Sequence, residues 1–167
     1  MKNKKKILIL NTGGTFNKCY NQYNGKLLVS NSNYYIKKII KQSTKINKTT
    51  KIDGLIYKDS LDITKKDRKE LIRYIKKSRF KKIIIVHGTD TIGITAKYLD
   101  KKIKNKQIVL VGSMRPFSIE PIEATANLMM AYGFLQNNKK NCIFIGIHGL
   151  VKKYNKIEKN RKLGVFV

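Results

Sequence analysis

The stretch Ile83-Ile84-Ile85-Val86, followed directly by His87-Gly88-Thr89-Asp90-Thr91, decides the fold class of this chain. Four consecutive β-branched residues that end at a glycine-containing turn are typical of a strand buried on both faces. A sheet is covered on both faces when its strands are mostly parallel and helices pack on each side. The stretch therefore predicts an α/β protein.

Similar apolar runs recur along the chain and alternate with helical patterns. Strands are expected at 7–10, 54–57, 83–86, 108–111 and 142–147, and helices around 35–40, 64–75, 94–103 and 121–135. Thr64 and Asp67 have the spacing of a capping box at the start of the second helix. Alternating strands and helices of this kind predict a fold built around a mostly parallel sheet.

Length and composition limit the class of protein. A chain of 167 residues with 41% hydrophobic residues is expected to form a single domain over 1–167, and it is too apolar for disorder. Cys19 and Cys142 have no metal-ligand spacing and predict two reduced thiols. The basic start, MKNKKK, precedes only four apolar residues, fewer than a signal peptide or membrane span needs. We expect a cytoplasmic protein with no membrane partner.

The net charge of +27 would ordinarily suggest a nucleic-acid partner. Only five of the 37 basic residues are Arg, and Lys, Ile and Asn together make 71 of the 167 residues. All three have A/T-rich codons, so a biased genome explains the excess of Lys. Arg is the better residue for bidentate phosphate and guanine contacts. A solvated basic surface without a nucleic-acid partner is the favoured interpretation.

Polar side chains follow several of the predicted strands. The loops are Thr12-Gly-Gly-Thr15, Lys58-Asp-Ser-Leu-Asp62 and His87-Gly-Thr-Asp-Thr91. Each alone is typical of a turn or a helix cap, and Asp90 could cap its helix. Neither glycine loop has the spacing of a nucleotide-binding motif, and two histidines are too few for a His cluster. Together, hydroxyls that converge with a carboxylate at one sheet edge predict acyl chemistry with a Thr nucleophile and neither metal nor cofactor.

The order of these motifs resembles the bacterial-type L-asparaginase/glutaminase family. The resemblance runs from Ile7 to about Asn160, and it includes Gly112-Ser-Met-Arg-Pro116 and the helix segment 123–128. It is strongest to the short, single-domain asparaginase-like proteins, because of Asn17-Lys-Cys-Tyr20 and Lys159-Asn-Arg-Lys. It implies a three-layer αβα sandwich of the flavodoxin-like kind, equivalent to the family's N-terminal domain, with the C-terminal asparaginase domain absent.

The resemblance also implies roles for individual residues. Thr15 matches the family's nucleophile, and Thr89, Asp90 and Lys159 match its second catalytic triad. Tyr20 matches the tyrosine of the flap that covers the nucleophile, with Tyr23 as the alternative.

Substrate contacts are implied as well. The matching positions are Gly14, Asp59, Ser60, Gly88 and Ser113. Ser60 corresponds to a contact with the substrate carboxylate, and Asp90 would also hold the substrate's α-ammonium. Leu61 stands where the family has a polar side chain, and a Leu cannot hydrogen-bond that carboxylate.

The implied activity is hydrolysis of L-asparagine to L-aspartate and ammonia through an acyl-enzyme, by a homo-oligomer that needs no cofactor. Two alternatives remain open. One is a non-catalytic or weakly active asparaginase-like protein that binds a small molecule. The other is an amidase for another small carboxamide, such as L-glutamine.

Overall fold

A computed structural model describes residues 7–44 and 50–167 of the chain and confirms the α/β class. The basic start of the chain, residues 1–6, lies outside the described residues. Within them, no helix has the length and apolar character that crossing a bilayer requires.

One sheet of six strands forms the centre of the molecule, in the order β4-β1-β5-β6-β7-β8. Its strands are β1 (Ile7–Gly13), β4 (Thr50–Lys58), β5 (Lys82–Val86), β6 (Gln107–Val111), β7 (Ile143–Ile147) and β8 (Leu150–Lys153). The first five run parallel, and β8 pairs antiparallel with β7. The five strands expected from the sequence are therefore present, and the sheet is mostly parallel as predicted.

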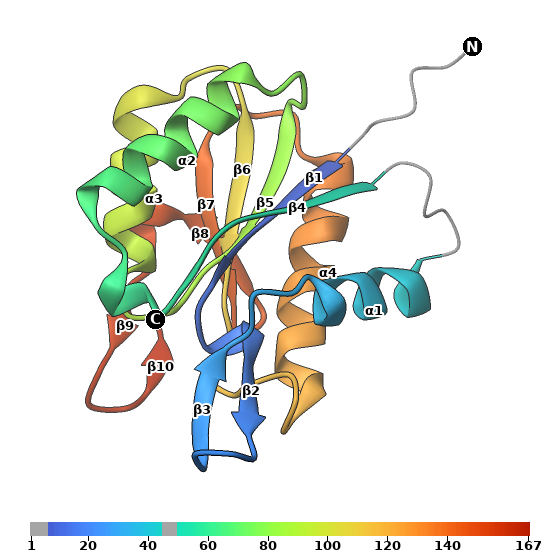
Figure 1. Cartoon of the computed structure of the whole chain (residues 1–167). Coiled ribbons are helices and arrows are strands. Elements are labelled where there is room, and N and C mark those ends of the chain that lie inside the picture. The colour runs from blue at the N-terminus through green and yellow to red at the C-terminus, as the bar shows by residue number, and fades with distance from the viewer. Residues whose placement is uncertain (1–6, 45–49) are drawn as a thin grey trace.

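In the described part of the chain, α-helices cover both faces of this sheet (Figure 1). Helices α1 (Tyr34–Ser43) and α4 (Pro121–Asn137) lie on one face, and α2 (Lys65–Lys77) and α3 (Ile92–Lys102) on the other. Alternate residues of β1 enter the two cores: Ile7 and Ile9 join α1 and α4, and Leu8 and Leu10 join α2 and α3. The side-chain period of a strand therefore builds a core on each side of the sheet, which gives the expected three layers.

Helix α2 begins at the predicted capping box. The Thr64 side chain accepts from the Asp67 N–H, and the Asp67 carboxylate accepts from the Thr64 N–H. Lys58, at the end of β4, donates to both Asp67 carboxylate oxygens at 3.0 Å. This contact fixes the start of α2 against the carboxyl end of the sheet.

Two hairpins extend from the carboxyl ends of the strands, at the bottom of Figure 1. They pair β2 (Lys18–Asn21) with β3 (Lys26–Val29), and β9 (Lys159–Asn160) with β10 (Val165–Phe166). The strand expected at 142–147 is present as β7, but it is not the last strand of the chain as expected, because β8, β9 and β10 follow it. These strands have only two to four residues, too few for the apolar run or alternation that marks a strand in a sequence.

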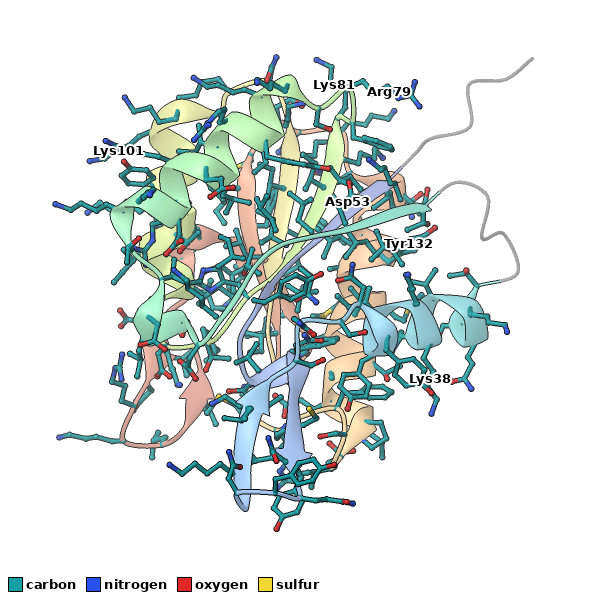
Figure 2. All side chains as sticks on the ribbon, viewed as in Figure 1. Lys38, Asp53, Arg79, Lys81, Lys101 and Tyr132 are labelled. Carbon is teal, nitrogen blue, oxygen red and sulfur yellow. The ribbon has the colours of Figure 1, made fainter. Side chains whose placement is uncertain are left out.

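Basic side chains project from several sides of the molecule. Figure 2 shows Lys38 on α1, Lys101 on α3, and Arg79 and Lys81 at the end of the sheet opposite the hairpins. These labelled basic side chains are therefore not gathered on one face of the molecule.

A chain of buried hydrogen bonds lies between α2, α3 and the end of β5. Arg68, Thr95 and His87 are 7%, 1% and 0% exposed. Arg68 Nε donates to Thr95 Oγ1 at 3.0 Å, and Thr95 Oγ1 lies 2.8 Å from His87 Nε2. His87 Nδ1 lies 2.8 Å from the Gly88 carbonyl oxygen. His87 is therefore a structural, hydrogen-bonded histidine, as its place after a buried strand predicts.

Burial makes His87 a pH-dependent element of stability. Desolvation lowers the pKa of its imidazole from 6.5 to about 4. Between these values the unfolded chain binds a proton that the folded chain does not, so the free energy of unfolding falls as the pH drops through this window. We expect a loss of about 3 kcal/mol between pH 7 and pH 4 from this group.

The measurement is urea unfolding of the wild type and of His87→Asn at pH 7, 5.5 and 4. The Asn amide can still donate to the Gly88 carbonyl but does not titrate, so its curve should be flatter by that amount. Equal pH dependence in the two proteins would show that His87 is not the group that titrates.

Candidate active site

The first loop of the site depends on two consecutive glycines after β1. Gly13 and Gly14 have φ angles of 99° and 77°, which disfavour residues with a Cβ. A Cβ on Gly13 would lie 2.5 Å from the Lys58 carbonyl oxygen, and one on Gly14 would lie 2.3 Å from the Gly88 nitrogen. The loop is therefore packed between the end of β4 and the loop that follows β5.

Thr15 comes next, at the start of a short 3-10 turn, Thr15–Asn17. Its side chain is only partly buried. The neighbouring Thr12 hydroxyl is buried and donates to the Val86 carbonyl at 2.7 Å. Among the described residues, by contrast, no hydrogen bond to the Thr15 hydroxyl is found. Thr12 thus anchors the loop, whereas the Thr15 hydroxyl is not used to hold it.

The structure brings together Thr89, Asp90 and Lys159. The Lys159 Nζ lies 2.9 Å from Thr89 Oγ1 and 2.8 Å from Asp90 Oδ1. The Lys159 side chain is only 14% exposed. Thr91 is the N-cap of α3 and Asp90 does not cap it, so the alternative reading of Asp90 as a helix cap is wrong. The Asp90 carboxylate instead compensates the charge of the lysine.

Lys159 reaches this position through the β9–β10 hairpin. The Phe166 N–H donates to His148 Nδ1 at 3.3 Å, and His148 Nε2 lies 3.3 Å from Glu123 Oε1. Glu123 in turn accepts two backbone N–H groups of the 112–116 loop. The hairpin is therefore fixed to the loop after β6, and both close the same edge of the sheet.

Arg161 is a second cation on Asp90. Its Nη1 lies 3.3 Å from Asp90 Oδ1 and its Nη2 lies 3.2 Å from the Asp90 carbonyl oxygen. The Arg161 side chain is 66% exposed, so the contact is solvated and weak. Asp90 nevertheless faces two positive charges, and this group of three side chains has a net charge of +1.

Ser60 lies beside the Thr89 loop. Its side chain is 1% exposed, and its hydroxyl oxygen has no hydrogen-bond partner within 7–44 and 50–167. A Cβ on Gly88 would lie 2.6 Å from the Ser60 Cβ, so Gly88 allows the two loops to touch. The Thr91 hydroxyl donates to the Ser60 carbonyl at 2.7 Å. The structure thus brings Gly14, Gly88 and Ser60 into one contact.

Asp59 caps the turn that holds Ser60 and contacts the β2–β3 hairpin. Its carboxylate accepts from the Leu61 N–H at 3.1 Å and lies 2.7 Å from Lys18 Nζ. Burial raises the pKa of Asp59, but the hydrogen bonds from Lys18 and Leu61 outweigh burial and hold the pKa below its ordinary value. Asp59 is therefore an ionised carboxylate. Its partner, Lys18, follows Thr15 by three residues.

Tyr20 is not brought to Thr15 in this structure. It is 61% exposed on β2, and its hydroxyl oxygen is 3.8 Å from the Cβ position of Gly25 at the hairpin turn. Tyr23 is fully exposed in the same hairpin. The role of either tyrosine as the flap residue stays a prediction that needs movement of the hairpin.

Ser113 uses its hydroxyl within the loop that follows β6. It is 1% exposed, and its hydroxyl donates to the Arg115 carbonyl at 2.6 Å. A side chain used in this way shapes its own loop, so the structure gives no support to a direct substrate contact by the Ser113 hydroxyl.

A cavity of 660 Å³ borders Asp90 and Lys159. Its wall includes the apolar side chains of Ile92, Ile157 and Phe166. Thr15 and Ser60 do not line it, so it lies against the triad from the side of the β9–β10 hairpin and does not open onto the Thr15 hydroxyl.

Sequence reasoning missed Lys18, Arg68 and Arg161. Arg68 lies four and seven residues before Ile72 and Ile75 on the buried face of α2, and a charge at helical spacing within an apolar stripe is a detectable signal. Lys18 and Arg161 are close in sequence to Thr15 and Lys159, but nothing distinguishes them among 37 basic residues.

Comparison with known proteins places this geometry in a family. The sequence matches the family described as "Asparaginase, N-terminal" over residues 6–164. The glutaminase-asparaginase of Acinetobacter glutaminasificans is 30% identical over 143 residues, which are 81% of this chain and 43% of that protein.

Solved structures agree. The thermostable L-asparaginase from Thermococcus kodakarensis superposes with a TM-score of 0.83 at 25% identity, over 97% of this chain and 50% of that one. The probable cytoplasmic L-asparaginase from Campylobacter jejuni gives 0.79 at 25% identity, over 98% and 52%. L-asparaginase I from Vibrio cholerae shares the fold, with a TM-score of 0.82 at 22% identity.

The chain thus spans about half the length of these relatives. Because the family match covers nearly all of its residues, the chain belongs to the asparaginase family and corresponds to the family's N-terminal domain.

Proposed function

We propose that this protein is an amidohydrolase that cleaves the side-chain amide of L-asparagine, with Thr15 as nucleophile. Membership of the asparaginase family supports the reaction class. The observation that carries the proposal is the Lys159 ammonium, 2.9 Å from Thr89 Oγ1 and 2.8 Å from Asp90 Oδ1. It lies beside a loop whose Thr15 hydroxyl has no hydrogen-bond partner among the described residues.

In the first half of the reaction, Thr15 Oγ1 attacks the carbon of the carboxamide. A new C–O bond forms, the carbonyl oxygen takes up negative charge, and the hydroxyl proton passes to the amide nitrogen. Collapse of the intermediate breaks the C–N bond and releases ammonia. The product is an ester between Thr15 and the acyl group.

In the second half, a water molecule attacks the same carbon and breaks the ester. The acid leaves, and the proton returns to Thr15. A hydroxyl is a poor nucleophile at its free pKa and needs a nearby group that takes its proton. We assign Thr89, whose hydroxyl accepts from Lys159, to a proton relay. Its oxygen takes the proton of the attacking hydroxyl or water while its own hydrogen passes to the amide nitrogen in the first half and to the Thr15 oxygen in the second.

A second substrate class is favoured by one contact. Arg161 already contacts Asp90, the residue that would receive a substrate ammonium, so it weakens recognition of an α-amine and leaves recognition of the carboxylate unchanged. A small carboxamide with a carboxylate and no α-amine, such as succinamic acid, is therefore the alternative substrate.

A competing reading is a protein that binds a small carboxamide or acid without efficient turnover. Such a protein would have the same loops as the proposed enzyme. It would differ from the enzyme only because its function does not need the Thr15 hydroxyl. Assembly into a homo-oligomer is part of the proposal, because it offers further residues to a site that is exposed on the β9–β10 side.

The first test is ammonia release from L-asparagine, D-asparagine, L-glutamine and succinamic acid. Thr15→Ala should lower the rate by about 10³-fold or more, because it removes the attacking atom. Thr89→Val should have a similar effect through loss of the hydroxyl that contacts Lys159.

Thr15→Ser and Thr89→Ser are the matched controls, since each keeps the hydroxyl and should retain measurable turnover. Full activity in Thr15→Ala would remove Thr15 from the mechanism. No release from any of the four amides by the wild type would favour the binding protein.

Lys159→Met tests the charge beside Thr89 while it keeps the length of the side chain. We expect turnover to fall by about 10²-fold or more, as for removal of other proton-transfer groups. Lys156→Met, on the same segment, is the control and should behave as wild type. Equal rates in the two variants would mean that the contact with Thr89 has no catalytic role.

Arg161→Ala tests the preferred substrate. Loss of the Arg161 guanidinium leaves Asp90 with Lys159 as its cation. The ratio of kcat/KM for L-asparagine to kcat/KM for succinamic acid should then rise by about fivefold. The change is modest because the Arg161–Asp90 contact is exposed. Lys162→Ala removes a charge from the same turn and should leave the ratio unchanged. A ratio that does not respond to Arg161→Ala would refute this role of Arg161.

A further inference from the structure

The buried chain of Arg68, Thr95 and His87 has a defined direction. A guanidinium has hydrogen-bond donors and no acceptor, so Arg68 Nε–H donates to Thr95 Oγ1 across 3.0 Å. The Gly88 carbonyl has no hydrogen to donate, so His87 Nδ1, 2.8 Å away, carries the imidazole hydrogen and donates it to that oxygen. His87 Nε2 then accepts, and the Thr95 hydroxyl donates its own hydrogen to it at 2.8 Å. The chain therefore allows a single tautomer.

That tautomer fixes a peptide group of the site. A trans peptide is planar, so its C=O and N–H point in opposite directions. His87 is 0% exposed and holds the Gly88 carbonyl on the core side of the loop. The N–H of Thr89, in the same peptide, is consequently directed away from the core. Loss of the bond to His87 would release this peptide to rotate.

Arg68 also controls a second loop. Its Nη1 donates to the Ile63 carbonyl at 2.9 Å, directly after the 3-10 turn Ser60–Asp62. The Thr91 hydroxyl donates to the Ser60 carbonyl at 2.7 Å from the other side. One guanidinium therefore sets the spacing between the turn that carries Ser60 and the loop that carries Thr89.

The guanidinium is costly to keep in this place. Arg68 is 7% exposed, and no carboxylate lies within ion-pair distance of it in the described part of the chain. A buried charge without an ion pair destabilises a fold compared with an apolar side chain of similar volume. Its hydrogen bonds to Thr95 Oγ1 and to the Ile63 carbonyl offset part of this cost. The first connects Arg68 to the Thr89 loop through His87, and the second connects it to the Ser60 turn.

The geometry points to Arg68 and Thr95 as positioning residues of the amide site, which act by holding His87 as the Nδ1–H tautomer and thereby orienting the Gly88–Thr89 peptide and the Ser60 turn. This assignment rests on the proposed hydrolysis at Thr15. Neither residue touches the substrate, and each acts through His87 or through the Ile63 carbonyl.

Thr95→Val is the decisive variant because it keeps the shape of the side chain and removes the hydroxyl. Thr95→Ser is its matched control because it keeps the hydroxyl. With only two histidines in the chain, the imidazole ¹⁵N resonances are assigned by comparison with His87→Asn. We expect the Nδ1–H tautomer of His87 in the wild type and in Thr95→Ser, and a different tautomer signature in Thr95→Val.

Kinetics provide the second readout, at a temperature where thermal melts show each variant folded. For Thr95→Val we expect kcat to fall by about tenfold or more, as for other small displacements of reacting groups, with KM changed by less than about twofold. Thr95→Ser should remain within about twofold of the wild type in both. A variant that only loses stability would not change the rate per folded site in this way.

Three results would overturn the assignment. They are a wild-type His87 with its hydrogen on Nε2, an unchanged His87 signature in Thr95→Val, and an unchanged kcat in Thr95→Val. If the wild type hydrolyses none of the amides, the proposed function has failed, and the Thr89 backbone amide resonance then decides the positioning role. A shift of that resonance in Thr95→Val but not in Thr95→Ser supports it, and no shift refutes it.

Discussion

The close contact of three loops through Gly14 and Gly88 is the constraint on which the rest of the site depends. A Cβ on Gly14 would lie 2.3 Å from the Gly88 nitrogen, and one on Gly88 would lie 2.6 Å from the Ser60 Cβ. Backbones can approach this closely only without side chains. Parallel strands bring their carboxyl ends to one edge, and the glycines let the loops at that edge pack closely, so that Thr15, Ser60 and Thr89 lie on adjoining loops.

Charge at this edge is organised in local pairs. Lys18 compensates Asp59 at 2.7 Å, and Lys159 compensates Asp90 at 2.8 Å. Arg161 adds an exposed positive charge to the second pair. A buried ion pair gains little net stability because desolvation offsets attraction. The useful effect of the Lys159–Asp90 pair is geometric, since it holds an ammonium donor against the Thr89 hydroxyl at a fixed distance.

Much of the fold could be predicted from the sequence because its central strands are continuous apolar runs and α2 combines a capping box with a periodic apolar face. The 83–86 run and the Thr64–Asp67 box show both signals. The hairpins could not be predicted in this way, since β9 has two polar residues, Lys159 and Asn160. The resemblance placed Lys159 in the site, but residue patterns alone did not. The orientation of Tyr20 and Ser113 depends on loop geometry that no pattern in the sequence records.

The polar chain under the site explains why one face of α2 is not wholly apolar. Leu71, Ile72 and Ile75 pack into the core, and Arg68 interrupts that stripe at helical spacing. An apolar residue there would add burial but would leave Thr95 and the Ile63 carbonyl without their donor. A buried donor or acceptor without a hydrogen-bond partner destabilises the fold by more than a satisfied one stabilises it. Because the Gly88 carbonyl can only accept, His87 donates from Nδ1 and accepts at Nε2, and Thr95 donates to Nε2 while it accepts from Arg68. The orientation of the Gly88–Thr89 peptide is therefore set from within the core.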